Sequence, residues 1–363
     1  MTRRVRLFLG IVIFLITGSI LFGVVGGIAY FPDRPLAGAA FGALAAGLAS
    51  GVIFLVIIGS EIFLPRTRLG LALERMPFLV TLGIKSLAYS AVILAVVGSK
   101  IGRWLAAYLV FGPEFAETVL GPEGLPVAIS ISVTLLVTLV AILLIQLSAL
   151  VGGSTLRDIA LGRYHRSRIE ERFFLFVDIV GSTPLAERLG PASVHDFLNQ
   201  VFQIASDPID AHGGEVYQYV GDEVVITWLM EDGRSGARPL ACYFAIERAL
   251  DSAAKDFEHN FGTVPRLRAA LHAGPVITGE VGGSRRSIVF HGDVMNTTSR
   301  IENATRDLQR SFLASEDALN RLEGVEVYAL ADLGPQQLRG RAAPLRVYAV
   351  ASESKLPVTN TNQ

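Results

Sequence analysis

The sequence predicts two domains of different kinds: an N-terminal all-α domain of four transmembrane helices and a C-terminal α+β domain. Long uncharged runs dominate residues 1–151, whereas residues 157–353 have the mixed composition of an ordinary soluble domain. This division explains a chain that is 51% hydrophobic with a mean hydropathy of +0.47. We expect a four-span domain over 1–151, a juxtamembrane helical linker over 152–171, the α+β domain over 172–351 and a disordered tail over 352–363.

Four apolar runs are long enough to cross a bilayer as helices. Leu7–Tyr30, Leu36–Ser60 and Pro126–Leu156 contain no Asp, Glu, Lys or Arg, and Phe78–Ser99 contains only Lys85. Each run exceeds the ~20 residues that an α-helix needs to span the hydrocarbon core. The first run could instead be a signal peptide, but it is longer than the ~7–15 apolar residues of a signal core. We therefore expect a retained helix there.

The basic residues are unevenly divided between the two sides of these spans. The opposite side from the termini holds only Arg34, Lys100 and Arg103. Because arginine and lysine accumulate on the cytoplasmic side, both termini are predicted to be cytoplasmic in a multi-pass protein of the inner (plasma) membrane, with the lipid bilayer as a partner. The predicted cytoplasmic arginines are Arg3, Arg4, Arg6, Arg66, Arg68, Arg75, Arg157, Arg163, Arg166 and Arg168.

Lys85 is the one charge inside a predicted span, about two turns from its start. A charge at that depth is costly unless it reaches water or a partner. Two interpretations stay open. Either the side chain snorkels toward the cytoplasmic interface, or it pairs with Glu61 at the end of the second span or senses something within the bilayer.

Composition excludes several other classes of site. The formal net charge is −1, so no overall basic field favours a nucleic-acid partner. Cys242 is the only cysteine, which rules out an intrachain disulfide and a cysteine-based metal site. Its apolar neighbours predict a buried helix position for Cys242.

Beyond the linker, strand and helix patterns alternate with hairpins among them, which is typical of an α+β fold. A strand ends near Gly181, and Thr183 followed by Pro184 predicts a helix N-cap and first helical residue. The Gly221-Asp222 pair indicates a hairpin. The remaining elements are predicted as a helix over 238–261, strands over 267–274 and 275–281, and a helix that starts within 291–305.

Two carboxylates follow predicted strands. Asp178 ends an apolar strand and Asp222 lies at a hairpin tip, so both can converge on one cation, and oxygen ligands suit Mg²⁺ or Mn²⁺. Gly181, Ser182 and Thr183 lie before a helix, where exposed N–H groups can bind triphosphate oxygens. The alternative is ordinary turn chemistry, with Asp178 as a helix cap and Asp222 as a turn former.

Three segments together resemble the class III adenylate and guanylate cyclases. FFLFVDIVGST resembles the first metal motif of that family, EVYQYVGDEVVITW the second, and GDVMNTTSRIE the motif with Asn and Arg four positions apart. They occur in the family's order over about residues 172–351. The resemblance implies a ferredoxin-like βαββαβ core. The four-span front and the segment LGRYHRSRIEERFF are similar to a subset of bacterial membrane cyclases.

The resemblance also implies an activity and its residues. Asp178 and Asp222 would hold two Mg²⁺ or Mn²⁺ ions per site, with the backbone carbonyl of Ile179 as a further ligand. Asn296 would orient the ribose and Arg300 would stabilise phosphate charge, both from the second subunit of a homodimer. The reaction implied is attack of the ribose 3′-hydroxyl of ATP on the α-phosphorus, giving cyclic AMP and pyrophosphate. Taken alone, Asn296 is an ordinary helix-start residue and Arg300 an exposed ion-pair former.

The expected base contacts depart from the family pattern. Gln218 stands where adenylate cyclases usually have Lys, and Val289 where they have Asp or Thr. Gln218 can still meet a base edge through hydrogen bonds, whereas Val289 cannot. Ser287 or His291 could take over, the alignment could slip by one residue, or the site could be permissive. The guanine pattern of Glu with Cys is also missing.

Three hypotheses for function follow. The leading one is a membrane-bound adenylate cyclase, with relaxed or GTP base choice as a variant. The second is a cyclase-like module that binds nucleotide for signalling and turns it over weakly. The third is a transporter or channel over residues 1–151 with a regulatory domain attached, for which a single charged residue inside the spans gives little support.

Overall fold

The computed structural model describes the C-terminal half almost completely and short stretches of the N-terminal half. The chain divides into two compact units, and Arg157–Gln363 forms the second. The described residues are 57, 59–60, 64, 67–74, 76, 80–92, 95, 163–164, 166–282, 287–341 and 343–352.

The described part of the N-terminal unit is mostly helical, in α3 (Arg68–Glu74) and over 80–92. Residues 80–92 fall within the third predicted span, and the hydroxyl groups of Tyr89 and Ser60 lie 2.7 Å apart. Within the described stretches, no helix has both the length and the apolar character needed to cross a membrane. The first and fourth predicted spans, most of the second, and the Glu61 partner proposed for Lys85 lie outside the described residues.

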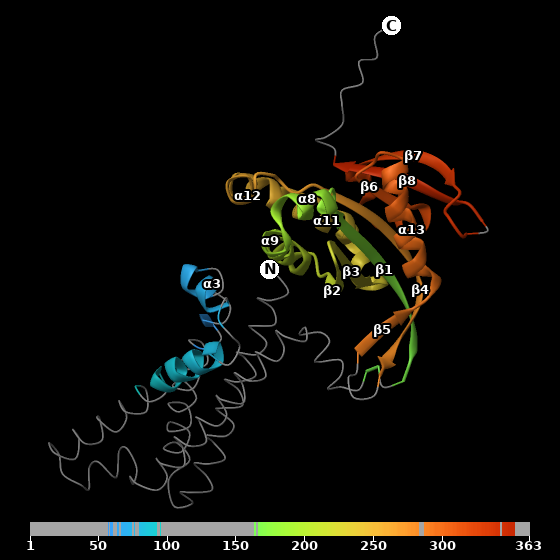
Figure 1. Cartoon of the computed structure of the whole chain (residues 1–363). Coiled ribbons are helices and arrows are strands. Elements are labelled where there is room, and N and C mark those ends of the chain that lie inside the picture. The colour runs from blue at the N-terminus through green and yellow to red at the C-terminus, as the bar shows by residue number, and fades with distance from the viewer. Residues whose placement is uncertain are drawn as a thin grey trace, which may run out of the picture. The chain divides into compact units, whose positions relative to one another are not determined.

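The C-terminal unit is built on one mixed sheet in the order β2-β3-β1-β4-β6-β8-β7, with β5 paired to β4 (Figure 1). Its central strands β2-β3-β1-β4 are antiparallel, and β4 and β6 are parallel. The strands are β1 (Arg168–Ile179), β2 (Glu215–Val220), β3 (Glu223–Leu229), β4 (Leu267–Val281), β5 (Ser287–His291), β6 (Phe312–Ser315), β7 (Tyr328–Gln336) and β8 (Leu345–Ser352).

Helices cover both faces of this sheet (Figure 1). The larger core lies under α9 and α11, where alternate residues of β1, such as Phe173 and Leu175, pack against Phe197 and Val201 of α9. Cys242 of α11 is buried in this core, as predicted. The helices are α8 (Ser182–Leu189), α9 (Pro191–Ala211), α10 (Met230–Arg234), α11 (Arg238–Ser252), α12 (Ala254–Phe261), α13 (Asp293–Asp307) and α14 (Glu316–Leu319), with short 3₁₀ turns η2 (Ser235–Ala237) and η3 (Val325–Val327).

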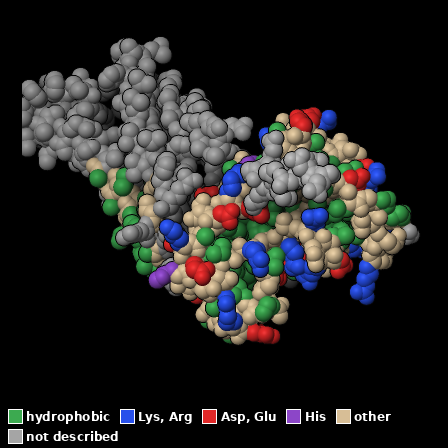
Figure 2. Space-filling view, turned by 90° about the horizontal axis from the view of Figure 1, so that it is seen from above, with side chains coloured by type: hydrophobic (Ala, Val, Ile, Leu, Met, Phe, Trp, Pro, Cys, Tyr) green, Lys and Arg blue, Asp and Glu red, His purple; other side chains and the backbone are tan. Residues whose placement is uncertain are grey.

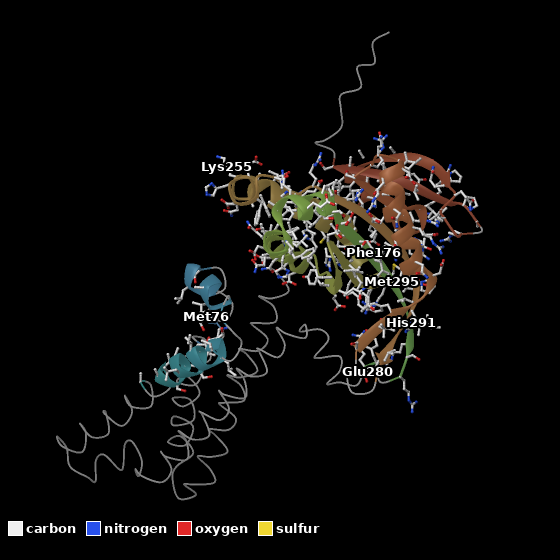
Figure 3. The ribbon with its side chains drawn as sticks, viewed as in Figure 1. Met76, Phe176, Lys255, Glu280, His291 and Met295 are labelled. Carbon is white, nitrogen blue, oxygen red and sulfur yellow. The ribbon has the colours of Figure 1, made fainter. Side chains whose placement is uncertain are left out.

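The second face of the sheet carries α13 and the predicted site. Side chains two residues apart on a strand share a face, so Arg172, Phe174, Phe176 and Asp178 all lie on this side of β1. The two phenylalanines form a smaller apolar cluster against α13, in which Met295 is half-buried. Figure 3 labels Phe176 and Met295 at this crossing. The outer surface mixes acidic and basic side chains over the face that Figure 2 shows.

The predicted α+β fold with a βαββαβ core is confirmed, but the two strands predicted over 267–274 and 275–281 are one strand, β4. Pro275 lies between Ala269–Leu271, which pair with β6, and Ile277–Val281, which pair with β5. Proline is tolerated at an edge position of this kind, because its missing N–H interrupts no ladder there. The predicted break at Pro275 is therefore wrong.

Two helix predictions are also wrong in detail. The helix predicted over 238–261 is divided at Ala253, whose φ of −94° and ψ of 6° end α11 before α12 begins. The predicted N-cap at Thr183 is displaced, because α8 begins at Ser182 after Gly181, which has a left-handed φ of 78°. Pro184 still lies in the first turn, where the helix needs no N–H donor.

Candidate active site

Two predicted metal ligands, Asp178 and Asp222, lie together at one end of the sheet. Asp178 is the penultimate residue of β1 and pairs across the ladder with Glu223, the first residue of β3. Asp222 directly precedes Glu223 in the tight turn after β2, where Gly221 has a left-handed φ of 64°. The hydroxyl group of Ser182 donates a hydrogen bond to the Asp222 carboxylate. A strand end, a hairpin tip and a helix start thus converge on one point.

Two arginines contact the Asp178 carboxylate. Arg268, its register partner on β4, donates from Nη2 to Oδ2 at 2.7 Å, and Nη2 of Arg306 lies 3.6 Å from the same oxygen. Asp178 is only 5% exposed, and this burial is the main reason that its pKa is raised. The hydrogen bond from Arg268 acts to lower the pKa of Asp178, and the charge of Asp222 raises it again. The net direction is upward, chiefly because of burial.

Two further carboxylates, not singled out in the sequence, share this end of the sheet. Burial, followed by the charges of Glu302, Asp178 and Asp222, raises the pKa of Glu223 to about 7. Glu302 of α13 is 5% exposed, and burial followed by Asp178 raises its pKa as well. Within the described structure, Oε1 of Glu302 has no hydrogen-bond partner, although Nη2 of Arg306 lies 3.9 Å away. Both residues lie inside the motifs that pointed to the site.

This cluster of carboxylates, an all-oxygen donor set, fits a divalent cation such as Mg²⁺ or Mn²⁺. In the part of the chain that the structure describes, no three or more His, Cys, Asp and Glu side chains are arranged to hold a metal by themselves. Proteins nevertheless often bind Mg²⁺ through only one or two carboxylates, while water and substrate phosphates supply the other ligands. Asp178 and Asp222 fit that role. The hydrocarbon side chain of Ile179 has no ligand atom, so this residue would offer only its backbone carbonyl.

The predicted phosphate-binding residues lie directly beside these carboxylates. Gly181 and Thr183 are exposed, and Ser182 is half-buried with its hydroxyl directed to Asp222. Gly181 turns the chain sharply from β1 into α8, and its carbonyl accepts the N–H of Leu185. The first turn of α8 therefore presents backbone N–H groups next to the candidate metal ligands.

Helix α13 directs Asn296 and Arg300 away from the carboxylates of their own chain. These two residues are four positions apart and share one side of the helix. Glu302, which adjoins Asp178, lies about 160° from Arg300 and about 120° from Asn296 around the helix axis. Asn296 is exposed and Arg300 is half-buried, with Nη2 3.6 Å from where a Cβ of Gly340 would lie. Asn296 and Arg300 therefore lie on a different side of α13 from Glu302, the residue that adjoins Asp178.

The two expected base contacts lie on β2 and β5. Gln218 is exposed on β2, next to a register shift in the ladder with β3. Val289 is half-buried on β5, paired with Gly279. Their neighbours Tyr217 and Phe290 have ring centroids 4.7 Å apart, so the two strands approach each other here.

A family model matches the part of the chain that contains these motifs. Residues 165–352, just over half of the chain, match the Adenylate and Guanylate cyclase catalytic domain. The chain belongs to this family. The resemblance seen in three sequence motifs is confirmed by this match.

Several of the proteins that this chain resembles are named adenylate cyclases. Adenylate cyclase 2 of Rhizobium meliloti (strain 1021) is 37% identical over 213 residues, which cover 59% of this chain and 59% of that protein. The adenylate cyclase of Anabaena cylindrica is 29% identical over 182 residues, or 48% of this chain and 36% of that protein. The crystal structure of the adenylyl cyclase CyaB from P. aeruginosa has 20% sequence identity and a TM-score of 0.46, covering 52% of this chain and 96% of that one. The chain therefore matches less than two thirds of the length of these curated relatives.

Proposed function

We propose that this protein is an adenylate cyclase that converts ATP to cyclic AMP and pyrophosphate in two composite sites of a homodimer. The observation that carries the proposal is the meeting of Asp178 and Asp222 at the end of β1, beside the first turn of α8. Family membership and the adenylate cyclases among its relatives support it.

Each residue has a role in that reaction. Asp178, Asp222 and the backbone carbonyl of Ile179 would hold two Mg²⁺ or Mn²⁺ ions. Bound ions lower the pKa of the ribose 3′-hydroxyl and offset charge on the phosphates. Backbone N–H groups at Gly181, Ser182 and Thr183 would orient the triphosphate.

The placement of Asn296 and Arg300 on α13 supports the homodimer. Around the helix axis, Arg300 lies about 160° and Asn296 about 120° from Glu302, whose charge interaction with Asp178 marks the side facing the carboxylates, so we expect both to be available to a second chain. There Asn296 would orient the ribose, and Arg300 would stabilise the charge that develops as pyrophosphate leaves. In a two-fold symmetric dimer, each chain would supply the metal carboxylates to one site and the Asn296–Arg300 pair to the other.

Base choice and location belong to the same proposal. Gln218 would hydrogen-bond the base, and the apolar Val289 would discriminate weakly, so GTP would be a poor but measurable alternative substrate. The uncharged runs of residues 1–151 would anchor the chain in the inner (plasma) membrane, with both termini in the cytoplasm.

The test is an assay of the full-length chain with Mg²⁺ or Mn²⁺ and either ATP or GTP. We expect cyclic AMP to predominate, and Asp178→Ala to lower the rate at least ~1,000-fold without loss of folded structure by circular dichroism. If the wild-type chain binds ATP but forms neither cyclic nucleotide, the second hypothesis, a nucleotide-binding signalling module, replaces this one.

A further inference from the structure

We propose that Arg172 is a positioning residue for base recognition, and that its guanidinium group sets the spacing between β2 and β5, the strands that carry Gln218 and Val289. This inference rests on the proposed function, because those two residues are base contacts only in a nucleotide site. Arg172 lies on the same face of β1 as Asp178 but at the other end of the strand.

The environment of Arg172 is closed and fully paired. Its side chain is 2% exposed, and arginine is almost never buried without partners. Nε donates to Glu170 at 2.9 Å, Nη2 donates to the hydroxyl of Tyr164 at 3.1 Å, and Nη1 donates to Glu215 at 3.4 Å. The guanidinium carbon lies 4.8 Å from the ring centroid of Phe290. All three nitrogens and one flat face are therefore used, a geometry that lysine cannot reproduce.

Glu170 holds the centre of this cluster. Its carboxylate also accepts hydrogen bonds from Tyr164 at 3.1 Å and from Thr278 of β4 at 3.1 Å. Although burial acts to raise the pKa of Glu170, its hydrogen bonds and the charge of Arg172 lower it overall. The ion pair of Arg172 and Glu170 is thus a fixed anchor on β1.

The other contacts of Arg172 lead to the base-contact strands. Glu215 is on β2, three residues before Gln218, and Phe290 adjoins Val289 on β5. β2 is separated from β1 by β3, and β5 pairs with β4 on the other side of β1, so Arg172 bridges strands on opposite sides of its own strand. The ladder between β2 and β3 is irregular here, because its register shifts between Val216 and Gln218. The contact from Arg172 to Glu215 therefore helps to hold this part of β2 in place.

The arm of β4 and β5 extends beyond this anchor. Figure 3 shows Glu280 and His291 on that arm, away from the crossing of β1 and α13 where Phe176 lies. Phe290, in contact with both Arg172 and Tyr217, lies where the arm meets the rest of the sheet. Movement of the arm would change the distance between Gln218 and Val289 while leaving the carboxylates at the far end of β1 in place.

The experiment compares Arg172→Met and Arg172→Lys with Arg321→Met in the full-length chain. Arg321 is the matched control, because it pairs with Glu171 on the opposite face of β1, with 3.7 Å between Nε and the carboxylate. We expect Arg172→Met to lower the ratio of kcat/KM for ATP to that for GTP by about tenfold, mainly through KM for ATP, because misplaced polar contacts lose discrimination. Arg172→Lys should recover part of the ratio, and Arg321→Met should leave it unchanged.

A second readout separates this inference from the proposed function. Equilibrium binding of fluorescent ATP and GTP analogues reports base preference even in a chain that turns over neither nucleotide. If the wild-type chain binds both analogues but makes no cyclic nucleotide, the proposed function fails and Arg172 is still tested by the change in preference. If Arg172→Met does not fold, Glu215→Gln, which keeps the Arg172–Glu170 pair, should lower the preference about threefold. An unchanged ATP-to-GTP preference in the folded variant would overturn the proposal.

Discussion

The two ends of β1 carry buried charges on the same face but differ in how those charges are satisfied. At the Arg172 end, the ion pair with Glu170 is surrounded by hydrogen-bond donors, and the pKa of Glu170 is lowered. At the Asp178 end, carboxylates outnumber the arginines that reach them, and the pKa of Glu223 is raised to about 7.

This difference separates a charge cluster that stabilises the fold from a charge cluster that can bind a cation. A buried ion pair with complete hydrogen bonds has no capacity left for a ligand. A buried carboxylate oxygen without a hydrogen-bond partner, such as Oε1 of Glu302, carries an uncompensated desolvation penalty. A bound cation can reduce that penalty. The following predictions test whether the two ends of β1 differ in this way.

The largest expected effect concerns the shared site at the Asp178 end. Asp178→Ala and Arg300→Ala chains should each be nearly inactive alone, because both sites of each homodimer are broken. Co-expression should restore roughly a quarter of the wild-type rate, because about half of the dimers pair one chain of each kind and each such dimer has one intact site. Cyclic nucleotide is measured after co-purification of the two chains. No recovery in a verified heterodimer would favour a site within one chain.

At the Arg172 end, the effect should appear in stability. Glu170→Gln removes the charge that neutralises a buried arginine, so the free energy of unfolding should fall by about 3 kcal/mol. Glu171→Gln, on the opposite face and 48% exposed, should change it by less than about 0.5 kcal/mol. Urea denaturation of the full-length chain measures both. Equal changes in the two variants would show that the network is not a stabilising cluster.

His272, on β4 opposite Phe174, lies between the two ends of β1. It is buried, with Nδ1 2.7 Å from the hydroxyl oxygen of Ser315. Burial is the main cause of a pKa lowered from 6.5 to about 4; Asp317 and Asp293 oppose that shift, whereas Arg341 and Arg321 add to it.

Because the unfolded chain binds the histidine proton at higher pH than the native chain, stability is lost as the pH falls from 6.5 toward about 4. The contribution of His272 to this loss should reach roughly 3 kcal/mol. The carboxyl groups with raised pKa values, such as Glu223, act in the opposite direction over the same pH range, so the test is the difference between wild type and His272→Asn, which keeps a partner for Ser315. Denaturant titrations at pH 7 and pH 4.5 measure the difference. A variant with the pH dependence of wild type would contradict the assignment to His272.

The sequence predicted what depends on local pattern. The alternation of strands and helices from β1 to β4 and the hairpin at Gly221-Asp222 follow from periodicity and turn chemistry, and both are observed, apart from the break predicted at Pro275 and the undivided helix predicted over 238–261. The pairing of Arg268 with Asp178 depends on the register between distant strands, which no local pattern contains. The hydrogen-bond deficit of Glu302 likewise depends on how α13 packs on β1. The metal, base and partner roles of the named residues stay predictions.

The smallest expected effect tests the surplus of charge directly. The charge of Asp222 raises the pKa values of Asp178, Glu223 and Glu302, so it repels its neighbours when no cation is bound. Asp222→Asn removes that repulsion and keeps an oxygen that can accept the Ser182 hydroxyl. In metal-free buffer at pH 8, we expect the free energy of unfolding to rise by about 0.5–1 kcal/mol, as often happens when a functional charge is removed.

Added Mn²⁺ should then stabilise the wild-type chain, because a ligand that binds only the native state favours it. The same addition should stabilise Asp222→Asn much less, because that variant lacks one of the two carboxylates that hold the ion. Asp196→Asn, an exposed change on α9, is the control and should leave both stability and the Mn²⁺ response as in wild type. A loss of stability in metal-free Asp222→Asn would mean that Asp222 belongs to a satisfied cluster like that of Glu170. The contrast between the two ends of β1 would then no longer hold.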